Sequence, residues 1–402
     1  STYVLRKLER LRRGQSLPIF TPVSSPWTGT HQTESERLLF HLRRVVPLRD
    51  SMASLVRSEG SPTQVLTHDE IAFLEAARNG QGDKVTELIL GKKVPAHFQD
   101  PNTGESAMMA ASAGGHREVI SVLIQYGAPW NATDMYGKSA GDYALRAGKQ
   151  DTVNQLVQYG VQAELLFAAM EANRGTNESL VPKAKDFLER HVRYEGDTLV
   201  DDENRGVMMA WEAPLMEAHA ELLCESKGDV LNIGFGMGFI DTAIQSFSPR
   251  SHTIIEAHPV VYKKMIDDGW NKKPNVNIVF GRWQDVIDGL GPFDSVYFDT
   301  FDDVGHLREF HQHLSKLVKP GGMYSFFNGI SDNIFFLGVA CETIKIELER
   351  LGFSSDFFPV DIDVSDPTIW KGTSFRYFES NQYYLPVCIR DKVSVGDVAV
   401  DE

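Results

Sequence analysis

The chain has 402 residues, of which 42% are hydrophobic and 24% are charged, and its formal net charge at pH 7 is -15. This length is enough for two or three domains with hydrophobic cores. No run approaches the roughly 18 apolar residues of a membrane helix. The three cysteines are far apart and odd in number, which excludes a disulfide framework and CxxC metal spacing and favours a reducing compartment. We expect a cytoplasmic protein, with the nucleus left open as a second location.

The charge is unevenly spread along the chain. Residues 1–67 hold 10 Lys or Arg against 5 Asp or Glu, whereas the remainder holds 30 against 50. The basic arm lacks the apolar core of a signal peptide and the interleaved aromatics of an RNA-binding module, so we expect no direct nucleic-acid binding and assign it no role. The acidic remainder favours a basic partner, although simple solubility explains it equally well.

The region from 68 to 170 repeats itself. Gly80, Gly114 and Gly148 are separated by 34 residues each, and three valines and three apolar pairs share that spacing. The period resembles that of ankyrin repeats, and about three units are the minimum for a continuous stacked core. The resemblance implies an all-α repeat domain. It serves either as a protein-docking surface or as a structural cap packed on the next domain.

A glycine-rich turn organises the second half. The apolar run 230–233 is followed at once by Gly234, Gly236 and Gly238, which predicts a buried strand turning into a helix around a ligand. In the dinucleotide fingerprint the sixth position is Gly or Ala, but here it is Phe239. The spacing therefore favours S-adenosylmethionine over NAD.

Strands and helices alternate after this turn, which predicts a parallel sheet covered on both faces. A strand at 253–256 ends in Glu256, where a carboxylate accepts hydrogen bonds from ribose hydroxyls. A strand at 277–280 precedes Trp283, which flanks adenine or packs on the core rim. A strand at 295–298 precedes Asp299, which lies over the site because ligands bind at carboxyl strand ends.

Other elements complete the expected sheet domain. We expect, in chain order, a linker helix and acidic loop over 180–203, a helix from about Pro214 to Cys224, a helix over 307–317, a turn at 319–322, a strand at 323–327, a helix at 341–351, and an antiparallel strand pair at 357–364 and 383–389. His306, His311 and His313 lie on the expected helix 307–317. Since His311 and His313 are two residues apart and face different ways, we predict no metal site.

Several motifs together resemble guanidinoacetate methyltransferase over about 187–391. They are GVMMAWEAPLM at 206–216, the glycine turn, Ile-Glu at 255–256, Gly-Arg-Trp at 281–283, Tyr-Phe-Asp-Thr at 297–300 and Lys-Pro-Gly-Gly at 319–322. With ankyrin-like repeats in front, the whole chain resembles the protein arginine N5-methyltransferases, the type IV enzymes. Motifs of the ω-nitrogen arginine methyltransferases and the N-P-P-Y of amide and adenine methyltransferases are missing.

The resemblance implies a Rossmann-like class I methyltransferase fold, with a mostly parallel seven-stranded sheet over 206–402, a linker at 171–205 and S-adenosylmethionine as cofactor. A guanidinium pairs with carboxylates and stays charged near neutral pH, so a carboxylate must take its proton during methylation. We assign Asp299 as that base and Glu212 to orientation; the structural alternative for Glu212 is a first-turn acid of the following helix. The expected cofactor residues are Tyr194, Met208, Met216, Gly234, Phe235, Gly236, Met237, Gly238, Phe239, Ile240, Glu256, Ala257, His258, Trp283, Gln284 and Asp299.

The leading hypothesis is methylation of the δ nitrogen of arginine in a protein, and the resemblance implies a large-subunit ribosomal protein as substrate. A small-molecule guanidino methyltransferase is the second hypothesis, which the repeats disfavour. A non-catalytic scaffold that only binds cofactor is the third.

Overall fold

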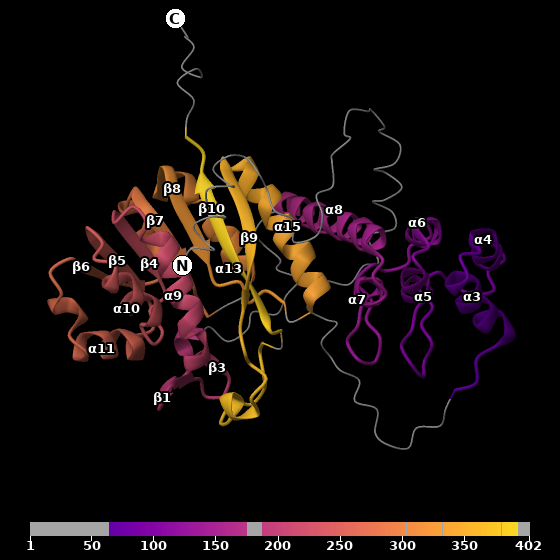
Figure 1. Ribbon diagram of the computed structural model, residues 1–402, viewed down its shortest axis with the longest axis horizontal. Coiled ribbons are helices and arrows are strands. Elements are labelled where there is room, and N and C mark those ends of the chain that lie inside the picture. The colour runs from indigo at the N-terminus through magenta and orange to yellow at the C-terminus, as the bar shows by residue number, and fades with distance from the viewer. Residues whose placement is uncertain (1–63, 175–186, 302–303, 332, 379, 393–402) are drawn as a thin grey trace, which may run out of the picture. The chain divides into compact units, whose positions relative to one another are not determined.

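The computed structural model describes residues 64–174, 187–301, 304–331, 333–378 and 380–392 (Figure 1). Almost all of the basic arm predicted over 1–67 lies outside these residues. The chain divides into two compact units. We call the one made of 18–175 and 333–343 the repeat unit, and the one made of 1–17, 176–332 and 344–402 the sheet unit.

The repeat unit contains three helix pairs, drawn from indigo to magenta in Figure 1. They are α3 (His68–Arg78) with α4 (Gly82–Leu90), α5 (Ala107–Gly114) with α6 (Arg117–Gln125), and α7 (Ala140–Arg146) with α8 (Gln150–Arg174). Thr67, Ser106 and Ser139 each cap the first helix of a pair by accepting a backbone N–H three residues on. Because α5 packs against both α3 and α7, the small buried residues of these helices form one continuous core.

The turn of the middle repeat lies one residue later than the 34-residue spacing predicts. The left-handed glycines are Gly80, Gly115 and Gly148, with φ of 73°, 79° and 66°, whereas Gly114 is the last residue of α5. The spacing found the three repeats but misplaced this turn, because two adjacent glycines satisfy the pattern equally well.

A segment from far along the chain completes the repeat unit. Phe335 packs so closely on Gly141 that a Cβ there would lie 2.0 Å from its ring, and the Asn333 amide donates to Asp142 Oδ2 at 2.7 Å. The helix α15 therefore spans Ile334–Arg350, and its start predicted at 341 is wrong. Asn333 Oδ1 caps this start by accepting the Phe335 N–H at 3.0 Å.

The sheet unit has a seven-stranded sheet in the order β6-β5-β4-β7-β8-β10-β9. Its strands are β4 (Asp229–Ile233), β5 (Ser251–Glu256), β6 (Val276–Phe280), β7 (Phe293–Phe298), β8 (Val318–Phe326), β9 (Phe353–Asp361) and β10 (Gln382–Arg390). All pairs are parallel except those of β10, which runs antiparallel to both neighbours. The predicted Rossmann-like fold is confirmed.

Alternating side chains of β7 and β8 bury both faces of the sheet. Tyr297 and its register partner Ser325 face α9 (Ala213–Leu223), whose His219 accepts or donates a hydrogen bond with Ser325 Oγ at 2.8 Å. On the other face, Phe298 stacks on Phe310 of α13 (Val304–His311) with ring centroids 4.3 Å apart. The helices α10 (Phe239–Ser246) and α11 (Pro259–Asp267) connect β4 to β5 and β5 to β6.

Two local predictions are wrong. Where a linker helix was expected, the described residues form a 3-10 turn, Phe187–Glu189, and a small sheet of β1 (Arg193–Glu195), β2 (Thr198–Val200) and β3 (Gly206–Met209). The strands are too short for their alternation to be read from the sequence. The helix expected over 307–317 breaks after α13, and α14 (Leu314–Leu317) follows. The expected turn 319–322 lies inside β8, opposite a register shift in β7.

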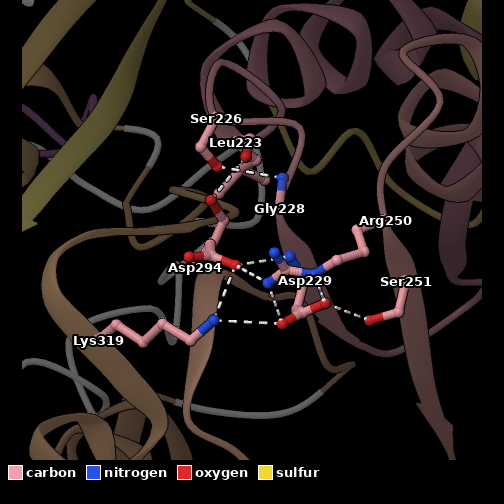
Figure 2. Close-up of polar contacts among 9 residues, drawn as sticks. Leu223, Ser226, Gly228, Asp229, Arg250, Ser251, Asp294 and Lys319 are labelled. Carbon is pink, nitrogen blue, oxygen red and sulfur yellow. Dashed lines mark hydrogen bonds and ion pairs between the residues drawn. The ribbon is translucent and has the colours of Figure 1, made fainter.

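An ionic cluster joins the amino ends of four strands (Figure 2). Lys319 Nζ lies 2.9 Å from Asp294 and 3.2 Å from Asp229, and Arg250 pairs with both carboxylates. The Arg250 guanidinium and Lys319 hold the pKa of Asp229 well below its usual value. The cluster fixes β4, β5, β7 and β8 at the edge opposite the carboxyl ends of β4, β5 and β7.

We predict that Lys319→Gln lowers the free energy of unfolding by about 0.5–1 kcal/mol at low salt, because the pair is partly exposed and screened. Since the folded-state pKa of Asp229 is depressed, the contribution is present above the unfolded pKa of about 4 and fades as pH falls further. Urea titrations at pH 7 and pH 3 measure it, with the exposed Lys316→Gln as control. Equal losses at both pH values would contradict the prediction.

Candidate active site

The glycine turn between β4 and α10 has the geometry of a ligand cradle. Gly234, Gly236 and Gly238 have φ of 94°, 54° and 72°, in the left-handed range that disfavours side chains. A Cβ on Gly234 would lie 1.8 Å from the Asp299 carbonyl oxygen. The absence of a side chain thus lets the ends of β4 and β7 meet at the point where the strand order reverses.

Three side chains hold this turn. Glu256, at the end of β5, accepts the Phe235 N–H at 2.9 Å and the His258 N–H at 2.6 Å. Burial raises the pKa of Glu256, and backbone N–H groups including those of Ala257 and Gly236 oppose the rise. The Tyr194 hydroxyl donates to Gly236 O at 2.9 Å, and Met208 Sδ accepts the Met237 N–H at 3.2 Å.

Glu212 and Asp299 come together beside the turn from different elements. Glu212 ends a 3-10 turn, Ala210–Glu212, and is 3% exposed, whereas Asp299 directly follows β7. Glu212 Oε1 accepts the Met209 N–H at 2.8 Å and the Tyr377 hydroxyl at 2.6 Å. Asp299 Oδ2 is enclosed and accepts no hydrogen bond from the described residues. The predicted structural role of Glu212 at a helix start and a role in the site therefore coexist.

The two carboxyl groups are close enough to influence each other. Burial raises the pKa of Glu212 to about 7, although hydrogen bonds from Tyr377 and Met209 oppose it. Burial also raises the pKa of Asp299 well above its usual value, and the charges of Glu212 and Asp241 add to the rise. Two desolvated acids in one place disfavour two negative charges, and a bound cation reverses that penalty.

Sequence reasoning missed an aromatic cluster beside Glu212. The connection between β9 and β10 brings Trp370 and Tyr377 to Trp211, with ring centroids 5.8 Å from Trp211 in both cases. The signal was present as the aromatic-rich stretch 370–378, but the chain distance to Glu212 hid it.

The remaining predicted residues divide into two groups. Phe235 and Ile240 are buried next to the turn, and Phe239 begins α10. His258 caps α11 through Nδ1 and meets the Arg190 carbonyl at 3.1 Å. Trp283 is 4% exposed and packs edge-on to Phe298 and Phe310, which agrees with the core-rim alternative. Gln284 donates to Glu309, and Met216 lies in the core beneath Tyr297.

The residues present fit S-adenosylmethionine, because the glycine cradle occupies space that any Cβ would fill and its helix N–H groups face it from α10. Glu256, Tyr194 and Met208 are the side chains that would hold it. In the described part of the chain, no group of three or more His, Cys, Asp or Glu has metal-binding geometry. Nor does any described helix combine the length and apolar character needed to cross a membrane.

Two family models match the chain. Guanidinoacetate N-methyltransferase matches residues 184–345, and ankyrin repeats in three copies match residues 73–166. Fold and site together define a Rossmann-like methyltransferase preceded by ankyrin repeats, and S-adenosylmethionine is its cofactor.

Relatives place the chain in one family. A Saccharomyces cerevisiae protein named protein arginine N-methyltransferase 2 is 34% identical over 388 residues, covering 81% of this chain and 92% of that protein. Proteins of the same name from Yarrowia lipolytica and Candida glabrata are 39% and 33% identical, covering 50% and 74% of this chain and 46% and 82% of their own lengths. The chain belongs to the protein arginine N-methyltransferase 2 family.

We predict that Gly236→Ala weakens binding of S-adenosylhomocysteine about tenfold, because the new Cβ would meet Met208 Sδ at 2.8 Å in a left-handed conformation. Isothermal titration calorimetry measures it. Gly289→Ala is the matched control, since a Cβ there meets nothing within 4 Å. Unchanged affinity in Gly236→Ala would show that the turn does not touch the cofactor.

Proposed function

We propose that this protein transfers the methyl group of S-adenosylmethionine to the δ nitrogen of an arginine in a protein substrate. The observation that carries the proposal is the buried pair Glu212 and Asp299 beside the glycine turn, each with an oxygen that accepts no hydrogen bond from the described residues. A guanidinium supplies both the positive charge and the N–H donors that such a pair lacks.

The proposed mechanism assigns different tasks to the two acids. S-adenosylmethionine supplies a methyl group on a sulfonium. Glu212 Oε2 accepts a guanidinium N–H and orients the plane of the group, while Asp299 accepts the proton from the nitrogen that is methylated. As the new N–C bond forms, the S–C bond breaks and its electron pair stays on sulfur. Since Asp299 must be ionised to take the proton, binding of the cation lowers its raised pKa before transfer.

The match to the guanidinoacetate model supports the δ nitrogen. Guanidinoacetate carries its methyl group on the nitrogen that is bonded to carbon, and in a peptidyl arginine the equivalent atom is Nδ. One pocket geometry therefore accounts for both products. A small guanidino substrate remains the second candidate on the same match.

The repeat unit supports a protein substrate. Its loop at 134–137 presents Met135 and Tyr136, 52% and 77% exposed, and ankyrin repeats have no chemistry of their own. We infer that these side chains dock the substrate protein. A basic ribosomal protein of the large subunit, which the family resemblance implies, matches the net charge of -15.

We predict that Asp299→Asn lowers the rate of protein methylation at least about 100-fold while S-adenosylhomocysteine binding largely survives, because only the proton acceptor is lost. Single-turnover transfer of labelled methyl groups measures the rate. Asp288→Asn, an exposed acid of the same unit, is the control. Full activity in Asp299→Asn would refute this assignment of the base.

We predict that Met135→Ser with Tyr136→Ser raises KM for a whole protein substrate about tenfold but leaves kcat/KM for a short arginine peptide unchanged, because docking is lost and chemistry is not. Point changes are preferable to truncation, since removing the repeats would expose Phe335 and Val339. An unaltered KM for the whole protein would contradict docking at this loop.

A further inference from the structure

Glu212 presents its two oxygens unequally. Oε1 accepts two hydrogen bonds, from the Met209 N–H at 2.8 Å and from the Tyr377 hydroxyl at 2.6 Å, while Oε2 accepts none from the described residues. The backbone donor comes with the local 3-10 turn. The hydroxyl comes from 165 residues further along the chain. Its position therefore depends on how the β9–β10 connection folds.

The connection is anchored by buried residues at each end. Val364 and Phe378 are 0% and 2% exposed within the core of the sheet unit. Between them, Trp370 Nε1 donates to Val364 O at 3.3 Å, and the Ser374 N–H donates to Asn204 O at 2.7 Å in the β2–β3 loop. These contacts fix a surface segment tightly enough to place one hydroxyl.

Gly206 at the start of β3 makes room for the Tyr377 ring. A Cβ on Gly206 would lie 2.8 Å from Tyr377 Cε1. The half-buried Tyr377 ring packs between Trp211 and Trp370, at centroid distances of 5.8 Å and 5.1 Å. The aromatic contacts hold the ring plane, and the glycine lets the ring approach β3, so the hydroxyl has a single direction, toward Glu212.

We propose that Tyr377 is a positioning residue for the substrate guanidinium: it engages Glu212 Oε1, so that Oε2 is the oxygen that meets the arginine. This inference rests on the proposed function and names a determinant that the family motifs at 206–216 and 297–300 do not contain. The ionisable groups that face Glu212 are Tyr377, Asp299 and Tyr297, and they come from the β9–β10 connection and β7. Among these three groups, Tyr377 is the one that donates a hydrogen bond to Glu212.

The hydrogen bond also favours the ionised form of Glu212, since it lowers the carboxyl pKa against the effect of burial. Without it, the pKa of Glu212 rises, and the guanidinium must meet a carboxyl that is protonated over more of the pH range. The deficit is therefore largest at low pH and shrinks as pH rises. A merely structural role would lower activity equally at every pH.

The test is Tyr377→Phe, which removes one oxygen and keeps the ring. We expect kcat/KM for an arginine peptide to fall about tenfold at pH 7, the acidic limb of its pH profile to move to higher pH, and S-adenosylhomocysteine affinity to stay unchanged. Gly206→Ala, which displaces the ring from β3, should produce the same shift. Tyr262→Phe, on α11, is the matched control. An unchanged pH profile in Tyr377→Phe would overturn the proposal.

A double-mutant cycle on equilibrium binding separates this inference from the proposed function. Peptide affinity is measured with S-adenosylhomocysteine bound, for Tyr377→Phe, Glu212→Gln and both together. Non-additive losses, with little further effect of Tyr377→Phe once Glu212 is changed, show that the hydroxyl acts through Glu212. Fully additive losses overturn the positioning role. A wild-type protein that binds cofactor but no arginine peptide overturns the proposed function, and this inference with it.

Discussion

Two carboxyl groups placed together out of water are the constraint on which this site depends. Glu212 and Asp299 each have a pKa raised by burial, and the charge of Glu212 adds to the shift at Asp299. Such a pair is unfavourable in the empty protein and becomes favourable when a permanent cation with several N–H donors enters. The same desolvation strengthens the electrostatic attraction on which binding relies. The site is therefore adapted to a guanidinium.

The rest of the sheet unit brings these groups together. Gly234 lets the backbone of Asp299 approach β4, Glu256 fixes the far side of the glycine turn, and Met208 joins the turn to the segment that ends at Glu212. Tyr377 adds a contact from the end of the chain. The cradle for the methyl donor and the acids for the acceptor thus share one wall, and a change in either is expected to be felt by the other.

Local patterns predicted the parts of the fold that local forces determine. The apolar run at 230–233 with its glycines, the acids after β5 and β7, and the repeat period all lie within short stretches, where strand burial and turn geometry leave a direct trace. The failures involve contacts between distant residues. The start of α15 is set by Phe335 packing on Gly141, and β1 and β2 are stabilised by pairing with each other and with β3. Tyr377 belongs to the same class, because nothing near residue 377 indicates Glu212.

The central claim is that the two acids direct a methyl group to the δ nitrogen of a protein arginine. The most direct measurement incubates the purified protein with labelled S-adenosylmethionine and, in parallel, a ribosomal-protein extract and guanidinoacetate, followed by acid hydrolysis and tandem mass spectrometry. We expect δ-methylarginine from the extract and no label in guanidinoacetate. Label on a terminal guanidinium nitrogen, label in a creatine-like product alone, or no transfer at all would contradict the claim.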